Sequence, residues 1–146
     1  MNGTDIKVKA VCSKFFECFE DLNLNYVVCL KVNSKNPGVL IYTNTMPEEA
    51  VCTITNTIPM IFHPEWSGLP WDIPSNNVVN RMADELIEKL EPFTEKVLVC
   101  LTLAGDDSRG GIIKYHSIHD ALLCMLAAVH QMYDLLETLQ EMDESQ

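Results

Sequence analysis

The chain has 146 residues, of which 47% are hydrophobic and 21% charged, a composition typical of one globular domain and unlike that of disordered chains. The formal net charge is −11, and no stretch gathers the Lys and Arg side chains that neutralise phosphates. We therefore expect neither nucleic acid nor a membrane as a partner. The acidity serves either solubility or a preference for a basic protein surface.

Cysteine use and the amino terminus indicate the compartment. The chain begins without an apolar signal segment, and no apolar stretch approaches the roughly 18 residues of a membrane span. We expect each of the six cysteines to be hidden in an apolar run such as "YVVCL" or "VLVCL", where free Cys behaves as a small core residue. We expect a reduced, cytoplasmic protein, with the nucleus as a further location, and no zinc ribbon, because the chain has no CxxC pair.

Three strands are predicted in the first third of the chain. Ile6, Val8, Ala10 and Cys12 alternate as on one face of a strand, which the phenylalanines that follow would extend past a bend. The segment "NYVVCLKVNSKNPGVLIYT", residues 25–43, then reads as two strands joined by a tight turn, since β-branched residues flank an Asn, Pro and Gly cluster. This hairpin should lie in mid-sheet or under helices.

The next segment is rich in proline. Residues 45–75 hold five of the seven prolines. Within it, "CTITNTIPMIF" (residues 52–62) alternates well enough for a strand that Pro59 would confine to a sheet edge. Residues 63–75 then form a long loop rich in Pro and Trp, and loops of that length often carry function.

The second half predicts helix, strand and helix. Ser75 or Asn76 would cap an amphipathic helix that ends before Pro92. Residues 95–103 are a continuous apolar run, typical of a central strand, and 104–111 are turn residues. A long helix should cover 117–141, and 142–146 should form a flexible acidic tail. The main apolar stripe of this helix, which we expect to pack on the sheet, comprises Leu122, Met125, Leu126, Val129, Met132, Tyr133, Leu136 and Leu139.

The predicted fold follows from this order of elements. We expect a single domain over 1–146 without an internal repeat. Its class is α+β, an α/β sandwich with a mainly antiparallel sheet and two helices packed on one face.

Catalytic and metal chemistry find little support in the sequence. "KYHSIHDALLC" places His116, His119, Asp120 and Cys124 near one another, but structural zinc needs four well-fixed ligands and no second motif supplies them. Asp106 and Asp107 could face Mg²⁺ or a phosphate, yet no phosphate-binding glycine motif accompanies them. We expect no enzyme activity, no cofactor and no metal. A small metal-dependent enzyme that uses the His116 region is kept as an alternative.

Five residues are candidates for a protein interface. Trp66 and Trp71 lie in the proline-rich loop, where Trp rings serve recognition or fold back over the sheet. On the last helix, apolar residues lie on further sides beyond the main stripe. A helix that is apolar around most of its circumference is buried on more than one side. Leu123, Ala127 and Leu135 belong to this surplus, which predicts a second subunit.

Two segments carry a resemblance to a known family. "VKAVCSKFFECFEDLNLNYVVCLKVNSKNPGVLIYT" is similar to the opening strand, bend and hairpin of the third proteasome assembly chaperone. "NNVVNRMADELIEKLEPFTEKVLVCLTLAGDDS" is similar to the helix, strand and polar loop that the third and fourth chaperones share. The chain departs from both in the loop of residues 63–74 and in its acidic tail, so the choice between third and fourth type stays open.

The resemblance implies a sheet backed by two helices and a non-catalytic chaperone. Such a chaperone forms a heterodimer with a paralogous subunit and holds proteasome α subunits during assembly of the 20S core particle. An alternative is a dimeric scaffold with a roadblock- or longin-like sheet, used in trafficking or signalling complexes. Co-purified partners would discriminate between the two.

Overall fold

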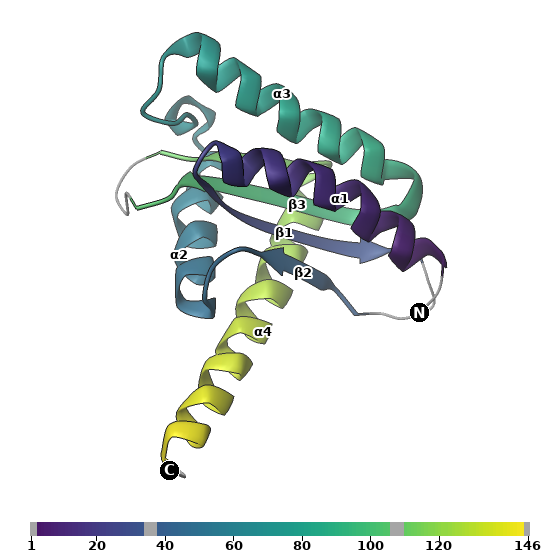
Figure 1. Ribbon diagram of the computed structural model, residues 1–146, viewed down its shortest axis with the longest axis vertical. Helices are drawn as coiled ribbons and strands as arrows, with labels where there is room; N and C mark the ends of the chain where they lie inside the picture. The colour runs from purple at the N-terminus through teal and green to yellow at the C-terminus, as the bar shows by residue number, and fades with distance from the viewer. Residues whose placement is uncertain (1–2, 34–37, 106–109, 145–146) are drawn as a thin grey trace.

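A computed structural model of the chain describes residues 3–33, 38–105 and 110–144. Its centre is a four-stranded antiparallel sheet with the order β2-β1-β3-β4 (Figure 1). The central strands are β1 (Leu24–Val32) and β3 (Thr94–Leu103), and the edge strands are β2 (Leu40–Thr43) and β4 (Ile112–Tyr115). The predicted antiparallel hairpin is confirmed as β1 and β2, and its turn at 34–37 lies outside the described residues.

Helices cover both faces of the sheet (Figure 1). One layer contains α1 (Gly3–Asp21) and α3 (Ile73–Leu90), and the other contains α2 (Pro47–Thr57) and α4 (Ile118–Glu144). The predicted α+β class with an antiparallel sheet is confirmed. The two helices expected on one face, α3 and α4, instead pack on opposite faces, and each shares its layer with a helix that the sequence patterns had assigned to strand.

The predicted opening strand is wrong, because residues 3–21 form α1. Alternation at Ile6 and Val8 suits a strand, but the buried residues Val8, Cys12 and Phe19 follow helical spacing. The strand prediction had placed Ile6 on the same face as the buried Val8, but Ile6 is 56% exposed. Phe16 stacks on Tyr26 of β1 with ring centroids 4.2 Å apart, so the aromatic residues of α1 pack on the sheet.

The edge strand predicted for residues 52–62 is also wrong. The segment forms most of α2 and a 3₁₀ turn at Ile58–Ile61. Pro47 begins α2 where its missing N–H costs nothing. Thr53 and Thr57 donate hydroxyl hydrogen bonds to the carbonyl oxygens four residues back, at 3.1 and 2.8 Å. Hydrogen bonding and burial against the sheet therefore override the β preference of these threonines.

The N-cap of α3 lies three or four residues before the two predicted caps, Ser75 and Asn76. Asp72 is the N-cap, and its carboxylate accepts the backbone N–H of Ser75 at 3.0 Å. Hydrogen bonds from Ser75 lower the pKa of Asp72 below its usual value. The predicted end before Pro92 is confirmed, since α3 ends at Leu90.

The element order reveals an internal repeat, contrary to the sequence-based expectation. The series helix, strand, strand, helix occurs twice, as α1-β1-β2-α2 and α3-β3-β4-α4. An offset of 71 residues carries Val28 onto its cross-strand partner Val99, and also Pro47, the first residue of α2, onto Ile118, the first residue of α4. The same offset aligns "VVCL" in β1 with "LVCL" in β3. The sheet therefore has an approximate two-fold axis between its central strands.

The turn between β3 and β4 supplies a test of backbone packing. Gly110 and Gly105 both have positive φ, +85° and +80°, but a Cβ on Gly110 would lie 2.2 Å from the Gly68 carbonyl oxygen, whereas a Cβ on Gly105 meets nothing within 4 Å. Gly105→Ala should cost only backbone strain, about 1–3 kcal/mol. Gly110→Ala should cost clearly more, as measured by chemical denaturation. Equal losses would contradict this packing.

Candidate interaction surface

The helix α4 carries two apolar stripes. The stripe that packs on the sheet is formed by buried residues, most of them small: Ala121, Cys124, Ala128 and Met132. Part of the stripe predicted to face the sheet does so, because Met132 is buried and Met125 and Val129 pack against this core. Leu126 and Tyr133 instead turn outward and are 61% and 56% exposed. The small side chains let the helix approach the strands closely.

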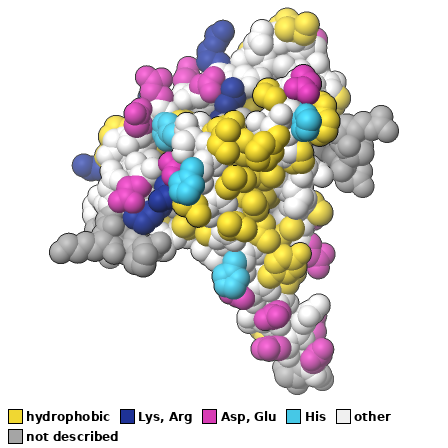
Figure 2. All heavy atoms as spheres, turned by 180° about the vertical axis from the view of Figure 1, so that it is seen from behind, with side chains coloured by type: hydrophobic (Ala, Val, Ile, Leu, Met, Phe, Trp, Pro, Cys, Tyr) yellow, Lys and Arg dark blue, Asp and Glu magenta, His cyan; other side chains and the backbone are white. Residues whose placement is uncertain are grey.

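The outward stripe forms a continuous apolar surface. We call it the outer α4 surface and define it by four residues at helical spacing: Ile118, Leu122, Leu126 and Tyr133. Figure 2, which views the molecule from the side opposite to Figure 1, shows a broad hydrophobic patch with histidine and acidic side chains at its borders. Exposed apolar patches of this kind on a folded chain mark interaction sites.

The three interface residues predicted on α4 lie on two different sides of the helix. Leu123 and Ala127 are one turn apart on a flank, where Leu123 is 41% exposed and Ala127 is half-buried. Leu135 continues the sheet-facing stripe one turn beyond Met132 and is 49% exposed. Neither position belongs to the outer α4 surface, of which Leu122, Leu126 and Tyr133 had been predicted to face the sheet.

The two tryptophans have different surroundings. Trp66 ends a 3₁₀ turn (Pro64–Trp66), is 56% exposed, and stacks on His63 with ring centroids 4.0 Å apart. Trp71 is half-buried and packs against the core between the sheet and α3. Asn76 holds this loop in place by accepting the Leu69 N–H at 2.6 Å and donating to the Trp71 carbonyl at 2.9 Å. Trp66 is thus available to a partner, whereas Trp71 mainly covers the sheet.

The His116 region shows no assembled metal site. His116 and His119 are both exposed, and no group of three or more His, Cys, Asp or Glu side chains within the described ranges could hold a metal ion. Ser117 caps α4, since its hydroxyl oxygen accepts the Asp120 N–H at 3.1 Å. Asp106 and Asp107 lie outside the described residues.

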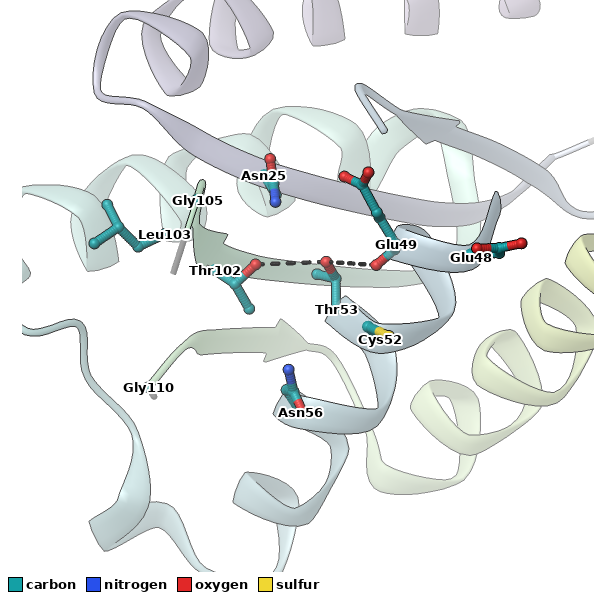
Figure 3. Close-up of a pocket in the computed structure, with 10 residues that line it drawn as sticks. All are labelled: Asn25, Glu48, Glu49, Cys52, Thr53, Asn56, Thr102, Leu103, Gly105 and Gly110. Carbon is teal, nitrogen blue, oxygen red and sulfur yellow. Dashed lines mark hydrogen bonds between the residues drawn. The ribbon is translucent and has the colours of Figure 1, made fainter. Parts of the chain in front are cut away.

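A pocket of about 690 Å³ opens between α2 and one end of the central strands (Figure 3). Glu48, Glu49 and Cys52 of α2 line one wall, and Asn25 and Thr102 belong to the strands. The Thr53 and Thr102 hydroxyls are 3.4 Å apart, and Thr53 also donates to the Glu49 carbonyl. This pairing satisfies the two buried hydroxyls within the protein. Among the described lining residues, the pocket presents carboxylates and amides at its mouth, and none is a nucleophile held by a neighbouring base.

The thiols are poor nucleophiles where they are buried. Burial raises the pKa of Cys12 and of Cys100 to about 12 in each case. Cys18 and Cys52 are exposed, contrary to the expectation that every cysteine is hidden in an apolar run.

Comparisons with known proteins return no relative. No protein-family model matches the sequence, and no match is found among curated proteins or solved structures. None of the helices in the described part of the chain combines the length and apolar character that crossing a bilayer requires.

Proposed function

We propose that the chain is a non-enzymatic interaction subunit that binds another folded polypeptide through the outer α4 surface. The observation that carries this proposal is the exposure of Ile118, Leu126 and Tyr133, at 46%, 61% and 56%, along one side of one helix. Fully burying a large apolar side chain gains about 1.5–3 kcal/mol. Covering three half-exposed ones therefore supplies a substantial part of a binding free energy.

The surroundings of this surface favour a protein partner. Apolar interface centres are typically rimmed by polar groups. Here His130 lies 3.6 Å from Asp134 on the same helix, and both side chains are well exposed. With a net charge of −11, the chain favours a partner whose rim is basic, because charge complementarity speeds encounter and selects against wrong partners.

The specific form of the proposal is an assembly chaperone. In this form the chain pairs with a paralogous subunit and the pair holds proteasome α subunits during assembly of the 20S core particle. The hairpin, α3 and β3 remain compatible with the resemblance that suggested it. The opening strand does not, because that segment is α1, so support for the specific form rests on the apolar surface, the acidity and the remaining elements.

Affinity purification from cells tests the proposal. Leu126→Glu with Tyr133→Glu places two charges at the centre of the outer α4 surface and should reduce recovered partner at least about tenfold. The matched control, Gln131→Glu with Thr138→Glu, adds two charges to the same helix on the side away from this surface and should retain the partner. Both pairs should melt like the wild type, because all four side chains are exposed.

The identity of the recovered protein separates the alternatives. Proteasome α subunits together with a paralogous chain would support the assembly chaperone. Trafficking or signalling scaffolds would support the roadblock- or longin-like alternative. Unchanged recovery with the Leu126 and Tyr133 variant would show that α4 does not hold the partner.

A further inference from the structure

The two edges of the sheet are treated differently. Ile112 and Ile113 of β4 are 0% and 8% exposed, and the carbonyl of Gly111, next to β4, accepts the Gly68 N–H at 2.8 Å. At the other edge Leu40 of β2 is 36% exposed and the residues after it are half-buried. Among the described residues, the ladder hydrogen bonds of β2 are made with β1 alone.

Nothing in the composition of β2 protects this edge. Proteins usually block an edge strand with Lys, Pro or a bulge, and β2 reads "LIYT". A groove of about 460 Å³ follows the strand. One wall is Phe16 of α1 and the other is Met132 and Leu135 of α4, so the groove passes over the edge from one helical layer to the other.

The helix α4 extends beyond this same edge. Figure 1 shows α4 crossing behind the strands and projecting past β2. Its sheet-facing stripe continues into the projection, because Leu135 and Leu139 follow Met132 at helical spacing. They are 49% and 40% exposed, whereas Met132 is 5% exposed. The apolar stripe that packs on the strands therefore extends beyond the edge of the chain's own sheet.

The length of the projecting part of α4 indicates how many further strands it can cover. From Met132, the last buried residue, to the helix end at Glu144, a rise of 1.5 Å per residue gives about 18 Å. Neighbouring strands lie about 4.8 Å apart. The projection can therefore cover roughly three further strands, more than one added peptide strand supplies and close to the sheet of another copy.

Charge points to the same occupant. The projecting part of α4 carries Asp134, Glu137 and Glu141, and α4 contains neither Lys nor Arg. Lys31 of β1 forms an ion pair with Glu95. Lys31 and Lys96 are cross-strand partners on β1 and β3, and they lie on the same face of the sheet as Cys29 and Leu98 of the α2/α4 core. This pair lies at the end of the sheet opposite the α2 pocket. The two lysines therefore lie next to the part of this face, beside α4, that a second α4 would cover.

We propose that the chain forms a two-fold homodimer in which the β2 strands of two copies pair antiparallel. The two four-stranded sheets then become one continuous sheet. Each α4 projection lies on the other copy's sheet, with Leu135 and Leu139 against the strands of that copy. The inference is independent of the outer α4 surface, which stays free for a different partner in this arrangement.

Mass measurement of the purified chain tests the dimer. Light scattering should give a mass near twice 16.5 kDa at micromolar concentration, and Leu139→Glu should weaken the dimer at least about tenfold. The matched control Leu126→Glu, on the outer α4 surface, should leave it intact. Leu139 lies beyond the chain's own sheet, so its variant should keep the wild-type circular dichroism and melting temperature.

Hydrogen exchange supplies the second readout. Amides of residues 40–43 that point away from β1 should exchange more slowly as the chain is concentrated, and Leu139→Glu should abolish this dependence. A wild-type monomer at 100 micromolar would overturn the inference, whatever else binds β2. So would a dimer that Leu126→Glu breaks and Leu139→Glu does not, although that result would leave the proposed role of the outer α4 surface standing.

Discussion

Replacing Phe19 by alanine should lower the free energy of unfolding by about 3–5 kcal/mol. The Phe19 side chain is fully buried between α1 and the sheet, and its ring centroid lies 6.1 Å from that of Tyr26. Domains of this size are stable by only about 5–15 kcal/mol, so the loss is a large part of the total. Urea denaturation followed by circular dichroism would measure it.

The control for this change is Ile6→Ala on the same helix. Ile6 is 56% exposed, and its truncation should change stability by no more than about 0.5 kcal/mol. If residues 6–12 formed a strand with Ile6 and Val8 on one buried face, Ile6→Ala would cost as much as other core truncations. A large loss at Ile6 would therefore contradict α1.

Replacing Ala128 by leucine should destabilise the fold by about 1–3 kcal/mol or more. Ala128 is fully buried where α4 meets the sheet, and three added carbon atoms must push the helix away from the strands. The thermal midpoint of unfolding would fall by several degrees, since 1 kcal/mol corresponds to roughly 2–8 °C for domains of this size range.

The neighbouring residue supplies the control. Ala127 is only half-buried on the flank of α4, so Ala127→Leu adds the same atoms where there is room for them and should leave the midpoint nearly unchanged. If Ala127→Leu were the more harmful change, the flank that carries Ala127 would face the sheet in place of the stripe that contains Ala128.

Continuous apolar runs and helix breakers predicted part of the fold correctly. The hairpin of β1 and β2, the central strand β3, and the helix ending before Pro92 follow from these signals. The failures share one cause. Residues 6–12 and 52–62 are rich in alternating or β-branched residues, which locally prefer strands. This preference is weaker than the stabilisation that the helices gain when Val8, Cys12 and Ile54 are buried. The sheet that buries them is formed by other parts of the chain, so the local sequence does not show it.

The interaction surface was only partly predictable. The surplus of apolar residues on α4 is evident in the sequence and indicates more than one covered side. The side that faces the sheet was predicted only in part. Met125, Val129 and Met132 of the predicted stripe do pack on this core. The close contact is made by Ala121, Cys124 and Ala128, and Leu126 and Tyr133 turn outward. The internal repeat left a readable signal in "VVCL" and "LVCL". The helices did not reveal it, because α2 and α4 differ in length, with 11 and 27 residues, and α1 and α3 differ in sequence.

Photo-crosslinking from position 126 in living cells tests the central claim most directly. A photoreactive amino acid there samples only what touches the middle of the outer α4 surface, because Leu126 is 61% exposed. The account predicts a specific crosslink to a different polypeptide, with none from the same group placed at exposed Thr138. If position 126 gives no crosslinked species while the protein is folded and abundant, the surface has no partner and the proposed function is wrong.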